Sequence, residues 1–136
     1  MPPERAEVVR WLVKADSDRR TAEAVLAQNP PITDTAAFHV QQSVEKTLKA
    51  YLVWRGIEFE KIHDLRLLVQ SCFSCDGEFN DLLPRVGPLT MYAVRFRYPG
   101  PLDPSVDEIR AALKVVVEVR EFVMARLPDD IRAAAP

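Results

Sequence analysis

Residues 37–50 read AFHVQQSVEKTLKA, and this stretch determines most of what the sequence predicts about the fold. Its apolar side chains recur at intervals of three and four residues, which is the period of an amphipathic helix. We expect Thr33 or Asp34 to cap the start of this helix and Gly56 to end it near Arg55. The predicted buried stripe consists of Ala37, Val40, Val44, Leu48 and Tyr51.

Helical spacing continues on both sides of this stretch. Residues 4–27 form one predicted helix, which the Asn29-Pro30-Pro31 turn ends. After a loop at residues 57–62, Asp64 is a plausible cap for a short helix that ends near residues 75–77. Residues 79–98 again have helical spacing, but their prolines and Gly87 predict a break or kink around Gly87.

A last helix is predicted after the turn at residues 99–101. Ser105 and Glu108 have the spacing of a capping box, although Asp103 is an equally plausible cap. This helix should run to about Leu127, where Pro128 stops it, and residues 133–136 should be frayed. Because no strand-like alternation is present, we predict an all-α, up-and-down bundle of about five helices. It should form one domain over residues 1–136, with its core at about residues 4–127.

Composition and charge exclude several functional classes. The hydrophobic share of 48% and charged share of 28% are typical of a globular protein. No apolar run is long enough to span a bilayer and no signal peptide is evident, so a cytoplasmic location is expected. The net charge of -2 gives no overall attraction to nucleic acid, so any such site must be local. Two cysteines are too few for a disulfide framework.

Two clusters of polar residues are candidate ligand sites. Gln42, Glu45, Lys46 and Lys49 share one stripe, either as a solvated face with a Glu45–Lys49 pair or as a surface that meets phosphate or an acidic partner. The second cluster is at residues 95–99, RFRYP. Its arginines either complement the end of a helix or hold a phosphate, with a tyrosine as a stacking surface. The candidate ligand-binding residues are Gln42, Lys46, Lys49, Arg95, Arg97 and Tyr98.

His63 is a candidate catalytic residue together with Arg97, because histidine can act as a general acid or base near neutral pH. A histidine before a helix cap is more often structural. Cys72 and Cys75 have CxxC spacing, but neither His39 nor His63 has ligand spacing with them, so no metal site is predicted. No cofactor-binding motif is present.

Three segments in this order resemble the HEPN domain family: residues 37–50, His63-Asp64-Leu65 and Arg97-Tyr98-Pro99. The similarity covers about residues 11–127. The resemblance implies a compact helical bundle, commonly a homodimer, often encoded beside a minimal nucleotidyltransferase in two-component or toxin-antitoxin systems.

Many HEPN proteins are metal-independent ribonucleases, whose motif is an arginine followed after four to six residues by a histidine. This chain departs from that pattern, because its nearest pair is Arg55 and His63, with seven residues between them, and no histidine follows Arg97. The resemblance therefore favours a non-catalytic module that dimerises and binds a nucleotide, or partners a nucleotidyltransferase. The alternatives are a ribonuclease toxin that uses His63, and a dimeric scaffold without a ligand.

Overall fold

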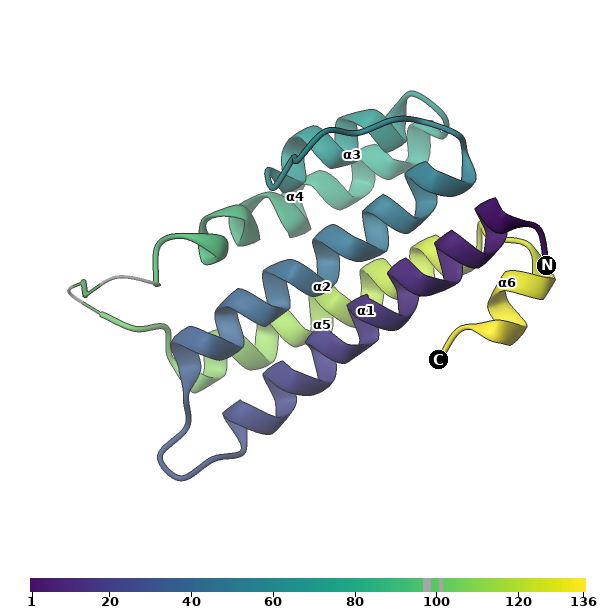
Figure 1. Cartoon of the computed structure of the whole chain (residues 1–136). Coiled ribbons are helices and arrows are strands. Elements are labelled where there is room, and N and C mark those ends of the chain that lie inside the picture. Colours follow the sequence, from purple (N-terminus) through teal and green to yellow (C-terminus); the bar gives the residue numbers. More distant parts are fainter. Residues whose placement is uncertain (97–98, 101) are drawn as a thin grey trace.

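The computed structural model describes residues 1–96, 99–100 and 102–136. Within these ranges the chain forms six α-helices and two 3-10 helices and contains no β-strand (Figure 1). The all-α bundle predicted from the sequence is confirmed. The α-helices are α1 (Pro3–Leu26), α2 (Thr33–Trp54), α3 (Leu65–Phe73), α4 (Leu83–Val86), α5 (Val106–Met124) and α6 (Asp129–Ala134). The 3-10 helices are η1 (Gly77–Leu82) and η2 (Gly87–Ala93).

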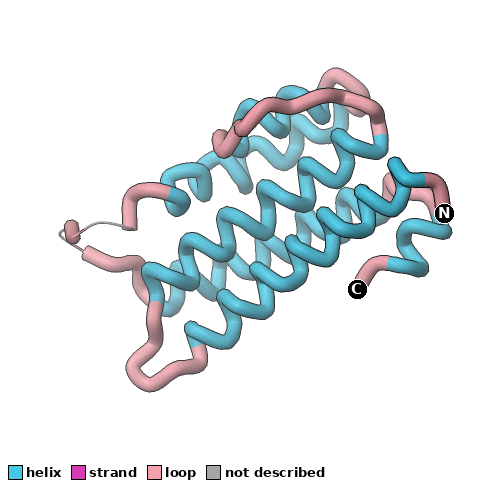
Figure 2. The backbone as a smooth tube through the Cα atoms, in the orientation of Figure 1, coloured by secondary structure: helices cyan, strands magenta, loops and turns pink. Residues whose placement is uncertain are grey.

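Three long helices, α1, α2 and α5, lie side by side and form the body of the bundle (Figure 1 and Figure 2). All five residues of the predicted α2 stripe are buried. They pack against apolar side chains of the two neighbouring helices, which include Val8, Leu12, Ile109, Val116 and Val123. Full burial of one such side chain contributes about 1.5–3 kcal/mol. This shared apolar core fixes α2 in the centre of the bundle.

The ends of the helices largely agree with the predicted caps. The Asp64 carboxylate accepts a hydrogen bond from the backbone N–H of Arg66 at 2.9 Å, and the Ser105 hydroxyl accepts one from Glu108 at 3.1 Å. Gly56 follows α2 with a φ of 70°, a left-handed conformation that favours glycine.

The predicted cap of α2 is wrong. The helix begins one or two residues earlier than a Thr33 or Asp34 cap requires, because the backbone N–H of Ala36 already donates to the carbonyl of Ile32 at 3.1 Å. The Asp34 carboxylate instead accepts from the N–H of Thr35. No side-chain hydrogen bond caps this helix.

The expected break around Gly87 is confirmed. Helix α4 ends at Val86, and the chain continues as the 3-10 helix η2. A β-carbon on Gly87 would lie 3.0 Å from the Arg66 side-chain Nε, so the absence of a side chain allows η2 to pass close to α3. Together, α3, η1, α4 and η2 form a second layer that covers one side of α2 (Figure 1).

The C-terminal end differs from the expectation of a frayed tail. Helix α5 ends at Met124, and residues 129–134 form the additional helix α6. Ile131 is fully buried, and α6 packs against α1. An ion pair of 2.5 Å between Arg5 and Asp130 joins the same two helices. Burial of Ile131 therefore orders a segment whose alanine-rich sequence suggested fraying.

Candidate functional site

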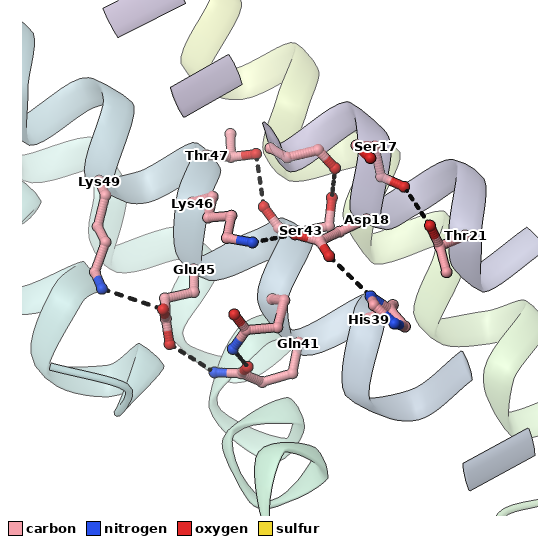
Figure 3. Close-up of polar contacts among 12 residues, drawn as sticks. Ser17, Asp18, Thr21, His39, Gln41, Ser43, Glu45, Lys46, Thr47 and Lys49 are labelled. Atoms are coloured by element: carbon pink, nitrogen blue, oxygen red, sulfur yellow. Dashed lines mark hydrogen bonds and ion pairs between the residues drawn. The ribbon is translucent and has the colours of Figure 1, made fainter. Parts of the chain in front are cut away.

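Two residues of the polar stripe of α2, Glu45 and Lys49, are buried within the protein. Figure 3 shows the polar contacts that this stripe makes. Glu45 is 3% exposed and Lys49 is 5% exposed. Their predicted pairing is confirmed by a distance of 3.1 Å between Lys49 Nζ and Glu45 Oε2. The interpretation as a solvated face is wrong for Glu45 and Lys49, because Trp11 and the loop at residues 57–64 cover them.

Glu45 also holds His63 in place. Its Oε1 lies 3.0 Å from His63 Nδ1 and accepts a hydrogen bond of 3.2 Å from the Gln41 amide. The same Gln41 amide donates to the His63 carbonyl at 3.0 Å. The imidazole nevertheless remains 65% exposed. A buried carboxylate therefore orients an exposed imidazole and fixes the direction of its ring.

Two aromatic rings surround the buried ammonium group of Lys49. Its Nζ lies 5.7 Å from the Trp11 ring centroid and 5.3 Å from that of Phe59. The rings meet edge to face with their centroids 5.8 Å apart. Cation–π attraction to the two rings and the ion pair with Glu45 together compensate for the hydration that the Lys49 ammonium loses on burial. The contacts of the Lys49 ammonium are therefore made within the protein.

A second polar cluster links α1 to α2. The Asp18 carboxylate lies 2.8 Å from His39 Nδ1 and accepts a hydrogen bond of 2.6 Å from Lys46 (Figure 3). Asp18 is only 8% exposed. Neither Asp18 nor this role of His39 was predicted from the sequence. A signal was present, because Asp18 occupies the position between Ala15 and Ala22 on the apolar stripe of α1.

Hydroxyl and amide groups complete the polar contacts on this face of α2. The Ser43 hydroxyl donates to the Ala15 carbonyl at 2.8 Å, which joins α2 directly to the α1 backbone. The Gln42 amide donates to the Gln41 side-chain oxygen at 2.7 Å. Gln42 and Lys46 are half-buried, so each retains some contact with solvent. The predicted ligand residues of α2 therefore differ in accessibility.

Arg95 has a different environment. It lies just beyond η2, is exposed, and contacts the Met91 sulfur at 3.5 Å and the Phe96 ring at 5.2 Å. Among the described residues, no carboxylate forms an ion pair with it. Arg97 and Tyr98, the other candidates of this segment, lie outside the described residues. Burial raises the pKa of the neighbouring Tyr92 phenol, so that group stays protonated at neutral pH.

The cysteines and histidines do not come together. Cys72 and Cys75 are free thiols, and burial raises the pKa of the Cys72 thiol. The imidazoles of His39 and His63 are held by different carboxylates. In the described ranges, no group of three or more histidine, cysteine or acidic side chains is placed to hold a metal ion. None of the described helices is both long and apolar enough to cross a membrane.

Comparison with known proteins identifies the family. The family model described as HEPN domain matches residues 8–127, which is nearly the whole chain. Neither the curated proteins nor the solved structures include a significant match. The matched range contains both polar clusters and the η2 segment, and the helical bundle agrees with the expected fold. The chain therefore belongs to the HEPN domain family.

Proposed function

We propose that this protein is a non-catalytic, single-domain HEPN module of the cytoplasm that binds the phosphate group of a nucleotide through the segment after η2. Arg95 carries the proposal, because its exposed guanidinium has no carboxylate partner among the described residues. A guanidinium in this state can donate two parallel hydrogen bonds to a phosphate without first breaking an ion pair. We include Arg97 and Tyr98 in this site as the second cation and a stacking surface.

Accessibility distinguishes this segment from the stripe on α2. Lys49 is buried and paired with Glu45, so we assign it to the interior of the protein rather than to the ligand. Lys46 is paired with Asp18 but retains partial exposure, and Gln42 is half-buried beside it. Within the proposal, Gln42 and Lys46 therefore make secondary contacts at most.

The same segment supports the proposal of a protein partner. Met91 and Val94 are exposed apolar residues that shortly precede Arg95 in the chain. Apolar side chains around an arginine are typical of protein interfaces. We propose that this surface docks a second copy of the chain or a minimal nucleotidyltransferase, as in toxin-antitoxin systems, and that nucleotide binding is linked to that contact.

Calorimetric titration with ATP tests the proposal. Arg95→Ala and Arg97→Ala should each weaken ATP binding about tenfold or more, because each removes a charged hydrogen-bond donor. Arg20→Ala is the matched control, since Arg20 is an exposed arginine of α1 without an ion pair among the described residues. Unchanged ATP affinity in the Arg95/Arg97 double variant would contradict the proposal. A complete absence of ATP binding would favour a dimeric scaffold.

A ribonuclease that uses His63 is the second candidate, and the contact between Glu45 and His63 favours it. An imidazole that a buried carboxylate orients can, in its neutral form, take the proton from a ribose 2′-hydroxyl. The 2′-oxygen then attacks the adjacent phosphate and the P–O5′ bond breaks, which leaves a 2′,3′-cyclic phosphate and a 5′-oxygen that takes a proton from water. The test is cleavage of a labelled single-stranded RNA in the presence of EDTA. Cleavage abolished by His63→Ala but retained by His39→Ala would establish this activity, and RNA left intact by the wild-type protein would exclude it.

A further inference from the structure

A groove lies between the N-terminal part of α1 and the loop that follows α2. Its volume is about 700 Å³. Trp11 and Phe59 form its aromatic part, and Gly56 lies at the point where α2 ends. Its lining residues belong to the start of α1, the end of α2 and the loop that follows, and these segments lie at the opposite end of the bundle from the chain that follows η2 (Figure 1). It is therefore separate from the proposed phosphate site.

The aromatic rings of the groove already contact one cation inside the protein. Trp11 and Phe59 meet edge to face, and the Lys49 ammonium lies within 6 Å of both centroids, at 5.7 Å and 5.3 Å. Glu45 neutralises this internal charge. Both rings are half-buried and line the groove. Because Lys49 is paired with Glu45, it adds no net positive charge beside them. Aromatic surfaces of this kind favour guanidinium and ammonium groups.

Three carboxylates add negative charge to the groove. Glu7 comes from α1, and Glu58 and Glu60 flank Phe59 in the loop. All three are exposed, and none has an ion-pair partner among the described residues. The neighbouring cations Arg10 and Lys14 line a separate hollow of about 300 Å³ that shares only Glu7 and Trp11 with the groove. The side of the groove formed by the loop after α2 therefore carries acidic and aromatic side chains.

We propose that this groove binds a basic segment of a partner protein, with an arginine or lysine side chain against Phe59 and Trp11 and its charge beside Glu58 and Glu60. The carboxylates come from two separate elements, so an extended segment with more than one cation fits them better than a single small cation does. A nucleic acid is disfavoured because its phosphates would face three unpaired carboxylates. This inference is independent of the proposed phosphate site.

The probe is an N-acetylated tetra-arginine amide, titrated into the full chain at low ionic strength and followed by calorimetry and by the indole N–H signals of the two tryptophans in NMR spectra. Trp54→Phe assigns the signals. The peptide should shift the Trp11 signal, and its affinity should fall as salt is added. A tetra-citrulline peptide, which has the same shape without the charge, should not bind.

Variants locate the binding. Glu58→Gln should raise the Kd of the tetra-arginine peptide about two- to fivefold, as expected for loss of one exposed ion pair. Glu108→Gln is the matched control, because it removes one exposed carboxylate at the other end of the bundle and retains a residue type suited to the capping box. Phe59→Leu should raise the Kd by a similar factor through loss of the aromatic face.

Three results would overturn the inference. The first is equal weakening by Glu58→Gln and Glu108→Gln, which would show nonspecific attraction to the whole protein. The second is equal binding of the citrulline peptide. The third is a shift of the Trp11 signal by oligouridylate but not by tetra-arginine, which would identify nucleic acid as the occupant.

Discussion

The α2 stripe and the segment after η2 both carry cations that the sequence marks as candidate ligand residues, yet the fold uses them differently. Lys46 and Lys49 are paired with Asp18 and Glu45. The exposed guanidinium of Arg95 contacts the Met91 sulfur and the Phe96 ring, and it has no carboxylate partner among the described residues. A buried, paired charge holds elements together, whereas an exposed, unpaired one remains available to a ligand. The variants below test this difference.

The largest effect is expected for Glu45→Ala, because it leaves the Lys49 ammonium buried without its counter-charge. The free energy of unfolding, measured by urea denaturation, should fall by about 3–5 kcal/mol. The double variant Glu45→Leu/Lys49→Met removes both charges and should recover most of that loss. If Glu45→Ala were as stable as the wild type, the pair would not stabilise the interior.

A smaller loss is expected for Asp18→Asn. This change keeps the shape of the side chain but weakens its contacts with His39 and Lys46, and should lower the free energy of unfolding by about 1–3 kcal/mol. Glu118→Gln is the control, because it disrupts the exposed Arg85–Glu118 pair and should cost about 1 kcal/mol or less. Equal losses in the two variants would show that the Asp18 cluster acts as a surface ion pair.

His63→Ala should have a still smaller effect, even though its partner Glu45 is the same carboxylate. The imidazole is largely exposed, so removing it should lower the free energy of unfolding by only about 0.2–1 kcal/mol. The denaturation experiment used for Glu45→Ala measures this directly. A loss as large as that of Glu45→Ala would assign His63 to the structural core of the cluster and weaken the case for proton transfer.

Arg95→Ala should change stability least. Its exposed guanidinium has no ion pair among the described groups, so the free energy of unfolding should stay within about 0.5 kcal/mol of the wild type. The ATP affinity of the same sample should nevertheless fall. A large loss of stability without any change in ATP binding would show that Arg95 is a structural residue rather than a ligand-binding one.

The helices were largely predictable because their signals are local. The spacing of Val40, Val44 and Leu48 and the caps at Asp64 and Ser105 each depend on residues within a turn or two. Helix α6 was missed because its order comes from packing of Ile131 against α1, a contact distant in sequence. The start of α2 was misplaced because it depends on a backbone hydrogen bond rather than on a side-chain cap.

The candidate site was predictable only where its partners are close in sequence. The Glu45–Lys49 pair follows from the four-residue spacing of a helix. Its burial does not, because the covering side chains Trp11 and Phe59 come from α1 and from a distant loop. For the same reason, the contact between Glu45 and His63 was invisible in the sequence. Periodicity identified the polar face of α2, but it could not identify the side chains from other segments that cover this face.

The packing of α6 against α1 has a practical consequence for anyone who shortens the chain. A boundary at residue 127, where the family match ends, would remove Ile131 together with the Arg5–Asp130 pair. The apolar surface of α1 that Ile131 covers would then face solvent, where it favours self-association. Recombinant production of this domain should therefore retain α6, and a C-terminal purification tag belongs after it.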